Sequence, residues 1–293
     1  MSEPRIQAIV AKFGGDLLQG GRAALIPGPG HSRRDRSLSM TLGHNGQLLF
    51  HSFAGDSLKD IQAYLGEEQG ANIRSHDPVV HQGAKQAADH ARKRLMAEQK
   101  AWCGKVWDQT LAADRAVIAV YFRHRGIGGP IPKVIRYHPD APLTYGGDHR
   151  SPAMIALVQN RAGDPCGLHV TSLMADGSDK AAGKSRRMFG SVKGGAIRLS
   201  EHSGHLAVAE GIETALSHQR LTQIPTWSCL SASGLAGFDI PRGVRQLTIA
   251  ADGDEAGLKA ANTLLEQAKT RCEVRLNPAP MGKDWNDVLK DGQ

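Results

Sequence analysis

The C-terminal third of the chain alternates short apolar runs with amphipathic helical patterns, and this alternation constrains the fold more than any other feature. The apolar runs "LAVA" and "QLTIAA" are each followed by a helical pattern, over residues 212–220 and 255–270, and the runs "TWSCLS" and "CEVRL" come after those helices. Strands that alternate with helices favour a parallel sheet with right-handed crossovers. The sequence therefore predicts a parallel-sheet, Rossmann-like α/β domain over residues 204–293.

Acidic residues follow two of the expected strands at the points where the strands end. Glu210 comes after the first strand, and Asp252 and Asp254 come after the third. Because the carboxyl ends of parallel strands lie at one edge of a sheet, we expect these carboxylates to converge in one crevice. Mg²⁺ (or Mn²⁺) takes hard oxygen ligands, often one or two carboxylates together with substrate phosphates, so we expect a divalent metal there. Alternatively, Asp252 and Asp254 only cap the following helix.

Three motifs in this region resemble those of the Toprim domain of primases and topoisomerases. They are VAEGIETAL at 208–216, IAADGDEAG at 249–257 and GKDWNDVL at 282–289, in that order. The resemblance implies that Glu210 is the catalytic general acid or base and that Asp252 and Asp254 bind magnesium.

The third motif offers two candidate metal ligands. The resemblance favours Asp287 over Asp284, and Asp284 is explained equally well as the N-cap of a helix. Lys283, in the same motif, is expected to contact phosphate. Glu213, in the first motif, is expected on a solvated helix face and without a catalytic role.

A basic segment precedes these motifs. Its cations are Lys180, Lys184, Arg186, Arg187 and Lys193, set in a Gly-rich stretch. We expect Arg186, Arg187 and Lys193 to bind phosphates of nucleic acid or nucleotide in a loop, because phosphate contacts position nucleic acid without reading its sequence. A solvated basic loop without a ligand is the alternative.

The middle of the chain mixes helical and strand patterns. Residues 113–200 are typical of an α+β subdomain, and they resemble the primase-like segment that precedes Toprim in many plasmid and phage replication proteins. Residues 76–112 are rich in Ala, Lys, Gln and Arg with few bulky apolar residues, which predicts an exposed helical linker.

Residues 1–70 resemble the zinc-binding module that opens many such primases, in which a C-x-x-H and a C-x-x-x-C pair hold the metal. The cysteine positions here hold Gly28, Ser52 and Asp56, and only His31 remains. A structural zinc normally has four N or S ligands, so we expect a degenerate zinc-ribbon-like module without zinc. His44 and His51 are the alternative zinc ligands, although lone histidines near a strand are more often surface or packing residues.

Composition narrows the class of protein. The chain of 293 residues carries a net charge of +7, which favours a polyanionic partner such as nucleic acid. Its four cysteines form no C-x-x-C pair, so neither a disulfide framework nor a cysteine zinc site is expected. No apolar run reaches the roughly 20 residues that span a bilayer, and we expect a cytoplasmic protein without membrane contact.

Together these features predict a magnesium-dependent DNA primase of a plasmid, phage or integrated element. Such an enzyme joins nucleoside triphosphates into short RNA primers on single-stranded DNA, and a replicative helicase is a candidate partner. A Toprim-type nuclease and a non-catalytic nucleic-acid-binding module remain as alternatives, since the same acids and metals serve hydrolysis. A topoisomerase is disfavoured, because no tyrosine stands in a recognisable nucleophile setting.

Overall fold

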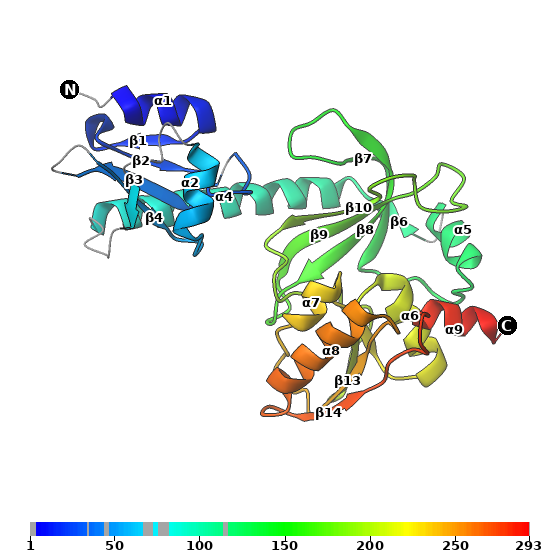
Figure 1. The fold of residues 1–293 in the computed structure, drawn as a ribbon. Coiled ribbons are helices and arrows are strands. Elements are labelled where there is room, and N and C mark those ends of the chain that lie inside the picture. The colour runs from blue at the N-terminus through cyan, green and yellow to red at the C-terminus, as the bar shows by residue number, and fades with distance from the viewer. Residues whose placement is uncertain are drawn as a thin grey trace. The chain divides into compact units, whose positions relative to one another are not determined.

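The structure is a computed structural model that describes residues 4–33, 35–43, 47–66, 73–75, 82–113 and 117–292, so His44 lies outside the described residues. The chain divides after residue 98 into two compact units (Figure 1). None of the helices within these ranges combines the length and apolar character needed to cross a bilayer.

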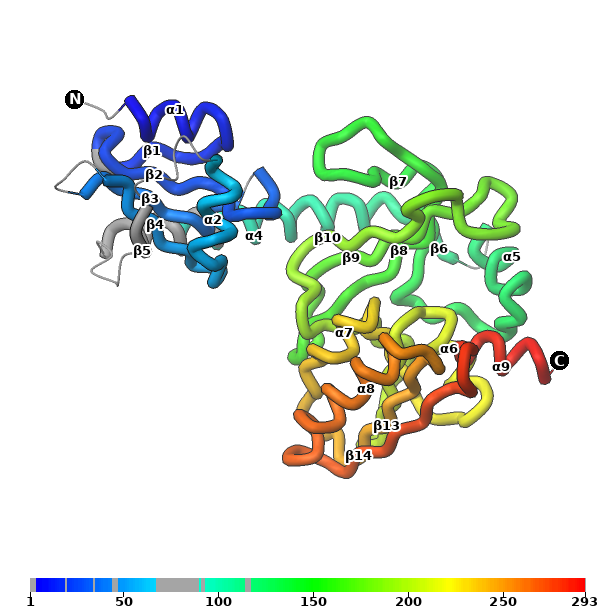
Figure 2. The backbone as a smooth tube through the Cα atoms, viewed as in Figure 1, coloured from blue at the N-terminus to red at the C-terminus, as the bar shows by residue number. Residues whose placement is uncertain are grey.

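In its described residues, the first unit is a five-stranded sheet with two α-helices and a 3₁₀ turn (Figure 2). Its strands are β1 (Asp16–Leu18), β2 (Ala23–Ile26), β3 (Leu38–Leu42), β4 (Leu48–Ser52) and β5 (Ile73–Ser75), in that order across the sheet, and its helices are α1 (Pro4–Phe13), η1 (Gln19–Gly21, a 3₁₀ turn) and α2 (Leu58–Leu65). β5 runs parallel to β4, and the other pairs are antiparallel. Ile6 and Ile9 of α1 and Ile61 and Leu65 of α2 are buried in one apolar core with the sheet.

The second unit begins with an antiparallel sheet. Its elements are α4 (Gln82–Asp108), which starts in the first unit, β6 (Leu111–Ala112), α5 (Val117–His124), β7 (Ile135–Pro142), β8 (Arg150–Gln159), β9 (Pro165–Ser172) and β10 (Arg186–Gly190). The strand order is β10-β9-β8-β7-β6. Residues 186–190, expected as part of a loop, therefore form an edge strand, and this corrects the sequence interpretation.

Both faces of this antiparallel sheet are covered. Successive side chains of β8 point to opposite faces, as the pleat requires. Ala153 and Ile155 pack with Cys103 of α4, whereas Met154 and Ala156 pack with α5 and with Ile212 of the next domain. The antiparallel sheet and the C-terminal domain therefore share one hydrophobic core.

The C-terminal domain has the predicted α/β architecture. Its elements are β11 (His205–Ala209), α6 (Ile212–Thr222), β12 (Thr226–Ser228), α7 (Ala232–Ala236), β13 (Gln246–Ala250), α8 (Glu255–Ala268), β14 (Glu273–Leu276) and α9 (Trp285–Asp291). The four strands are parallel in the order β12-β11-β13-β14, which confirms the predicted fold class. Because β11 and β13 are neighbours with Ala209 opposite Ala250, their carboxyl ends lie side by side.

His218 connects α6 to the start of β12 and to the segment that follows β14. Its Nδ1 lies 2.8 Å from Thr226 Oγ1, which donates its own hydrogen to Ile224 O, and its Nε2 lies 3.1 Å from Asn277 Nδ2. Only a neutral ring with its hydrogen on Nδ1 satisfies both contacts. Burial lowers the pKa of His218 to about 4, which agrees with the neutral form.

Candidate active site

Glu210 lies at the carboxyl edge of the parallel sheet, directly after β11. Its side chain crosses to the first turn of α8, where Oε1 lies 3.0 Å from the place that a Cβ on Gly257 would occupy. Burial, followed by the charge of Asp254, raises the pKa of Glu210, and Arg186 partly offsets this. The register of β11 and β13 thus brings Glu210 to the acids that follow β13.

Of these acids, Asp252 lies in the surroundings least favourable to a negative charge. Its Oδ1 is buried and has no hydrogen-bond partner among the described residues. Burial, followed by the charges of Glu210, Asp284 and Asp254, raises the pKa of Asp252 to about 7. A carboxylate in these surroundings is costly unless a positive charge is supplied.

Asp254 is both a helix cap and a member of the acidic group. Its Oδ1 accepts a hydrogen bond of 2.7 Å from Gly257 N at the start of α8, so the capping alternative describes this residue correctly. The side chain is exposed, and its second carboxylate oxygen takes no part in the cap. Capping and metal binding are therefore compatible at Asp254.

The loop between β13 and α8 is held by the segment before α9. Gly253 N donates to Lys283 O at 2.8 Å, and Gly282 N donates to Gly253 O at 2.8 Å. A Cβ on Gly253 would collide with Pro280 O, so the close approach of this backbone requires glycine. This approach brings the third sequence motif to Asp252.

The two acids of the third motif form a capping box at the start of α9. Asp284 Oδ1 accepts from Asp287 N at 2.8 Å, and Asp287 Oδ2 accepts from Asp284 N at 3.1 Å. The charge of Asp284 raises the pKa of Asp252, and no such effect of Asp287 on Asp252 is resolved. Lys283 Nζ forms an exposed ion pair with Asp291 Oδ2 at 2.6 Å, and its contact with phosphate stays a prediction.

The acids suit a divalent cation only if substrate supplies further ligands. No group of three or more His, Cys, Asp or Glu side chains in the described ranges is spaced as a metal cage. Mg²⁺ is commonly held by one or two carboxylates together with substrate phosphates and water. The unpartnered oxygen of Asp252, next to Glu210 and Asp254, fits that smaller set of protein ligands.

The basic segment sends neighbouring arginines to different surroundings. Arg186 lies opposite Thr171 of the neighbouring strand β9, and alternation places its side chain on the sheet face that meets α5 and α6. The charge of Arg186 lowers the pKa of Glu210. Arg187 belongs to the opposite face, and its guanidinium donates to Lys184 O. Lys193 is exposed beyond the end of β10. Of these three cations, only Arg186 lowers the pKa of Glu210.

Glu213 is buried, which overturns the expectation of a solvated helix face. It is 6% exposed, Lys180 Nζ lies 2.8 Å from its Oε1, and the Tyr121 hydroxyl donates to the same oxygen. Lys180 and the Tyr121 hydroxyl lower the pKa of Glu213 to about 2 against the effect of burial. A signal was present in the sequence, because "IETALSH" lacks the run of charges expected on an exposed helix face.

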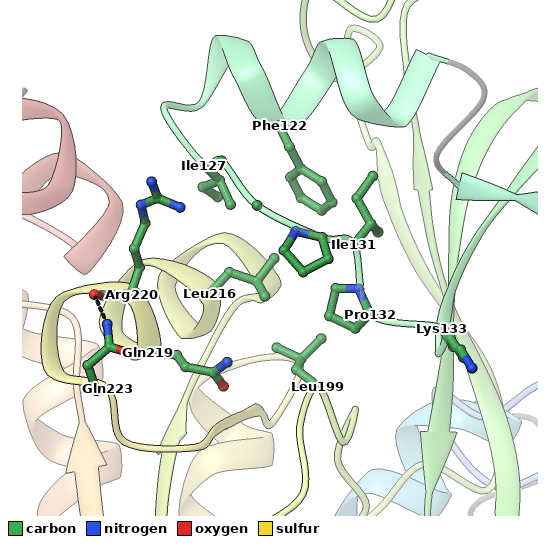
Figure 3. A pocket seen from close by; sticks show the side chains of 13 residues that line it. Phe122, Ile127, Ile131, Pro132, Lys133, Leu199, Leu216, Gln219, Arg220 and Gln223 are labelled. Carbon is green, nitrogen blue, oxygen red and sulfur yellow. Dashed lines mark hydrogen bonds between the residues drawn. The ribbon is translucent and has the colours of Figure 1, made fainter.

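A cavity of about 480 Å³ lies beside the C-terminal half of α6 (Figure 3). Phe122, Ile131, Leu199 and Leu216 form its apolar part, and Arg220 stands at its side. Glu210 precedes the other end of α6, and no acidic residue lines the cavity. This cavity is therefore separate from the acidic group.

In the first unit, the four positions matched to zinc ligands do come together. Ser52 Oγ donates to Asp56 Oδ2 at 2.7 Å, and His31 Nε2 lies 3.8 Å from Asp56 Oδ1. A Cβ on Gly28 would lie 2.7 Å from Asp56 Oδ2 and 3.0 Å from His31 Nδ1. Asp35 also contacts His31 Nδ1, at 2.9 Å. Polar contacts among Ser52, Asp56 and His31 thus join the loops at the positions matched to zinc ligands.

Comparison with known proteins assigns part of the chain. Residues 205–293 match the Toprim domain family, so this region is a Toprim domain, as the motifs predicted. Residues 97–199 match a domain of unknown function (DUF7146). No curated protein matches the chain.

The solved structures to which this chain is similar include three primases. A primase of Aquifex aeolicus (zinc-binding and RNA polymerase domains) is 16% identical, with a TM-score of 0.46 over 99% of this chain and 80% of that one. The primase fragment of the bacteriophage T7 primase-helicase protein is 18% identical, with a TM-score of 0.39 over 59% and 65%. A DNA primase domain from Pseudomonas aeruginosa is 16% identical, with a TM-score of 0.33 over 49% of this chain and 48% of that one.

Proposed function

We propose that this chain is a magnesium-dependent DNA primase that makes short RNA primers on single-stranded DNA. The observation that carries the proposal is the Asp252 carboxylate, which has an unpartnered buried oxygen and is surrounded by Glu210, Asp254 and Asp284 in a Toprim domain. Such a group is costly when empty and favourable when a divalent cation and phosphates neutralise it.

Each acid has a distinct task in this proposal. Asp252 and Asp254 hold Mg²⁺ (or Mn²⁺), with Asp284 close by and Asp287 holding Asp284 through the capping box. The bound metal stabilises the attacking and leaving oxygens of nucleotidyl transfer. Glu210, whose pKa is raised, is placed to take the proton of the attacking 3′-hydroxyl, because a base works best when its pKa approaches the working pH.

Single-stranded DNA and nucleoside triphosphates are the proposed substrates. The net charge of +7 favours a polyanion, and Arg186 supplies a cation on the Glu210 side of the antiparallel sheet. Arg187, on the opposite face of β10, and Lys193, beyond the end of that strand, are the other proposed phosphate-binding cations. Two further parts of the proposal rest on the resemblance of the sequence to plasmid and phage primases. They are replication of a plasmid, phage or integrated element, and interaction with a replicative helicase.

Two tyrosines of the second unit are unsuited to the nucleophilic role that a topoisomerase needs. Tyr121 is fully buried, and its hydroxyl donates a hydrogen bond to Glu213. Burial raises the pKa of Tyr145 to about 12, and its hydroxyl accepts from Gly190 N at 2.7 Å. A nuclease needs no tyrosine, so it is the second candidate, with water in place of the 3′-hydroxyl.

Incubation of the purified chain with single-stranded DNA, magnesium and labelled nucleoside triphosphates tests the proposal. We expect short labelled oligomers without any added primer, and their loss when EDTA removes the metal. Shortening of the DNA would instead assign the nuclease. Binding without either product would leave a nucleic-acid-binding module.

A further inference from the structure

A buried ion pair joins the β9–β10 connection to α6, three residues beyond Glu210. Lys180 Nζ lies 2.8 Å from Glu213 Oε1, and the two side chains are 17% and 8% exposed. The Tyr121 hydroxyl of α5 donates to the same carboxylate oxygen. Three elements distant in sequence thus converge on one carboxylate.

Backbone hydrogen bonds fix the point from which Lys180 reaches Glu213. Lys180 forms an antiparallel bridge with Leu173 at the end of β9, and Ala181 N donates to Ser172 O at 2.9 Å. Ser172 N donates to Ser185 O at 2.8 Å, directly before β10 begins. The connection is therefore tied to β9 at Lys180 and again just before Arg186.

Arg186 is a second cation in the same neighbourhood. It shares one face of the sheet with His169. Burial lowers the pKa of His169 to about 4, against the charge of Glu213 and together with the charges of Arg186 and Lys180. The charge of Arg186 also acts on Glu210. Unlike Lys180, Arg186 is exposed, and its side chain forms no ion pair or hydrogen bond with the part of the chain that the structure describes.

We infer that Lys180 is a positioning residue, which occupies Glu213 and thereby leaves the Arg186 guanidinium free to bind a phosphate beside Glu210. A buried carboxylate that loses its partner strongly attracts another cation. Arginine forms such pairs readily, because its planar guanidinium matches a carboxylate. Without Lys180, Glu213 would therefore draw Arg186 away from Glu210.

This inference rests on the proposed function in one respect, namely that Arg186 binds a phosphate. The test measures binding of a fluorescein-labelled oligothymidylate by anisotropy over a range of salt concentrations. We expect R186Q to weaken binding about tenfold near 0.1 M salt and to flatten the salt slope by about 0.7, the value for one phosphate contact on a single strand. K180M should cause the same loss, and K180M/R186Q should lose no more than R186Q alone.

Two further variants separate positioning from a merely structural role. K180R keeps a cation on Glu213 and should bind like the natural protein. K180M/E213Q removes both charges, so nothing remains to capture Arg186, and its binding and salt slope should also be those of the natural protein. R150Q, which removes an exposed arginine paired with Asp140, controls for the loss of one surface charge.

The outcomes distinguish this inference from the proposed function. If R186Q binds normally, Arg186 contacts no phosphate, and both the phosphate role and the inference are wrong. If R186Q is weak but K180M/E213Q is equally weak with native tryptophan fluorescence, the inference alone is overturned. K180M and R186Q losses that multiply in the double variant would also overturn it, because Arg186 would then act independently of Lys180. If K180M fails to fold, weakened binding by a folded K180M/E213Q protein still overturns the inference.

Discussion

Replacing Gly257 with alanine tests whether the Glu210 carboxylate packs on the first turn of α8. A Cβ at this position would lie 2.7 Å from Asp252 O and 3.0 Å from Glu210 Oε1. Alanine gains up to about 1 kcal/mol of helix propensity over glycine, whereas overpacking costs about 1–3 kcal/mol. We expect a net loss of about 1 kcal/mol of unfolding free energy, and about 100-fold slower primer synthesis because Glu210 and the Asp252 loop move.

Gly104→Ala is the matched control. Gly104 is an exposed glycine in α4, and a Cβ there would meet nothing within 4 Å. The same substitution should therefore stabilise the chain by up to about 1 kcal/mol. All four tryptophans lie in the second unit, so thermal melting followed by tryptophan fluorescence reports on both variants. The midpoints should move in opposite directions, by about 2–4 °C each. A Gly257→Ala protein that melts as high as Gly104→Ala would refute the described packing.

The remaining predictions concern charge, metal and pH. Arg186→Gln and Arg187→Gln remove the same charge from adjacent residues. We expect the larger loss of primer synthesis from Arg186→Gln, because of these two arginines only Arg186 acts on Glu210. Equal losses in a primer assay would contradict this. Elemental analysis should find less than one zinc per chain in the natural protein, and one zinc once cysteine replaces the three substituted ligand positions of the first unit, because these converge with His31. The free energy of unfolding should fall as the pH is lowered from 6.5 to 4, because the lowered pKa of His218 means that the unfolded chain binds a proton before the folded chain does. His218 contributes up to about 3 kcal/mol of this loss. Urea midpoints that do not change over this range would show that His218 is not held neutral.

Alternation of pattern was enough to predict the C-terminal domain. Each expected strand and each long helix there is present, because apolar periodicity and chain direction are local properties of the sequence. The parallel sheet also predicted that Glu210 and Asp252 converge at one edge, and the pairing of β11 with β13 brings them together. The short helix α7 was not predicted, since five residues that include Gly234 give no measurable periodicity.

The surroundings of individual side chains depended on packing between distant segments, which the sequence did not reveal. Glu213 is buried because α5 and the antiparallel sheet cover α6, and Tyr121 lies 92 residues before it. Arg186 and Arg187 were grouped together because β10 was taken for a loop, and only a strand sends neighbours to opposite faces. Asp284 rather than Asp287 acts on Asp252 because of a backbone approach at Gly253 that no motif spacing encodes.

The most direct test of the central claim is a paired measurement on Asp252→Asn, which combines thermal melting without metal and primer synthesis with magnesium. The raised pKa of Asp252 means that its charge destabilises the folded chain above the carboxyl's ordinary pKa, so Asn should raise the melting temperature at neutral pH. The same change removes a magnesium ligand, so synthesis should fall by a factor of about 100 or more. A variant that melts higher and makes no primers is the predicted result. A variant that melts lower, or that makes primers at the natural rate, would contradict the assignment of Asp252 as a metal ligand.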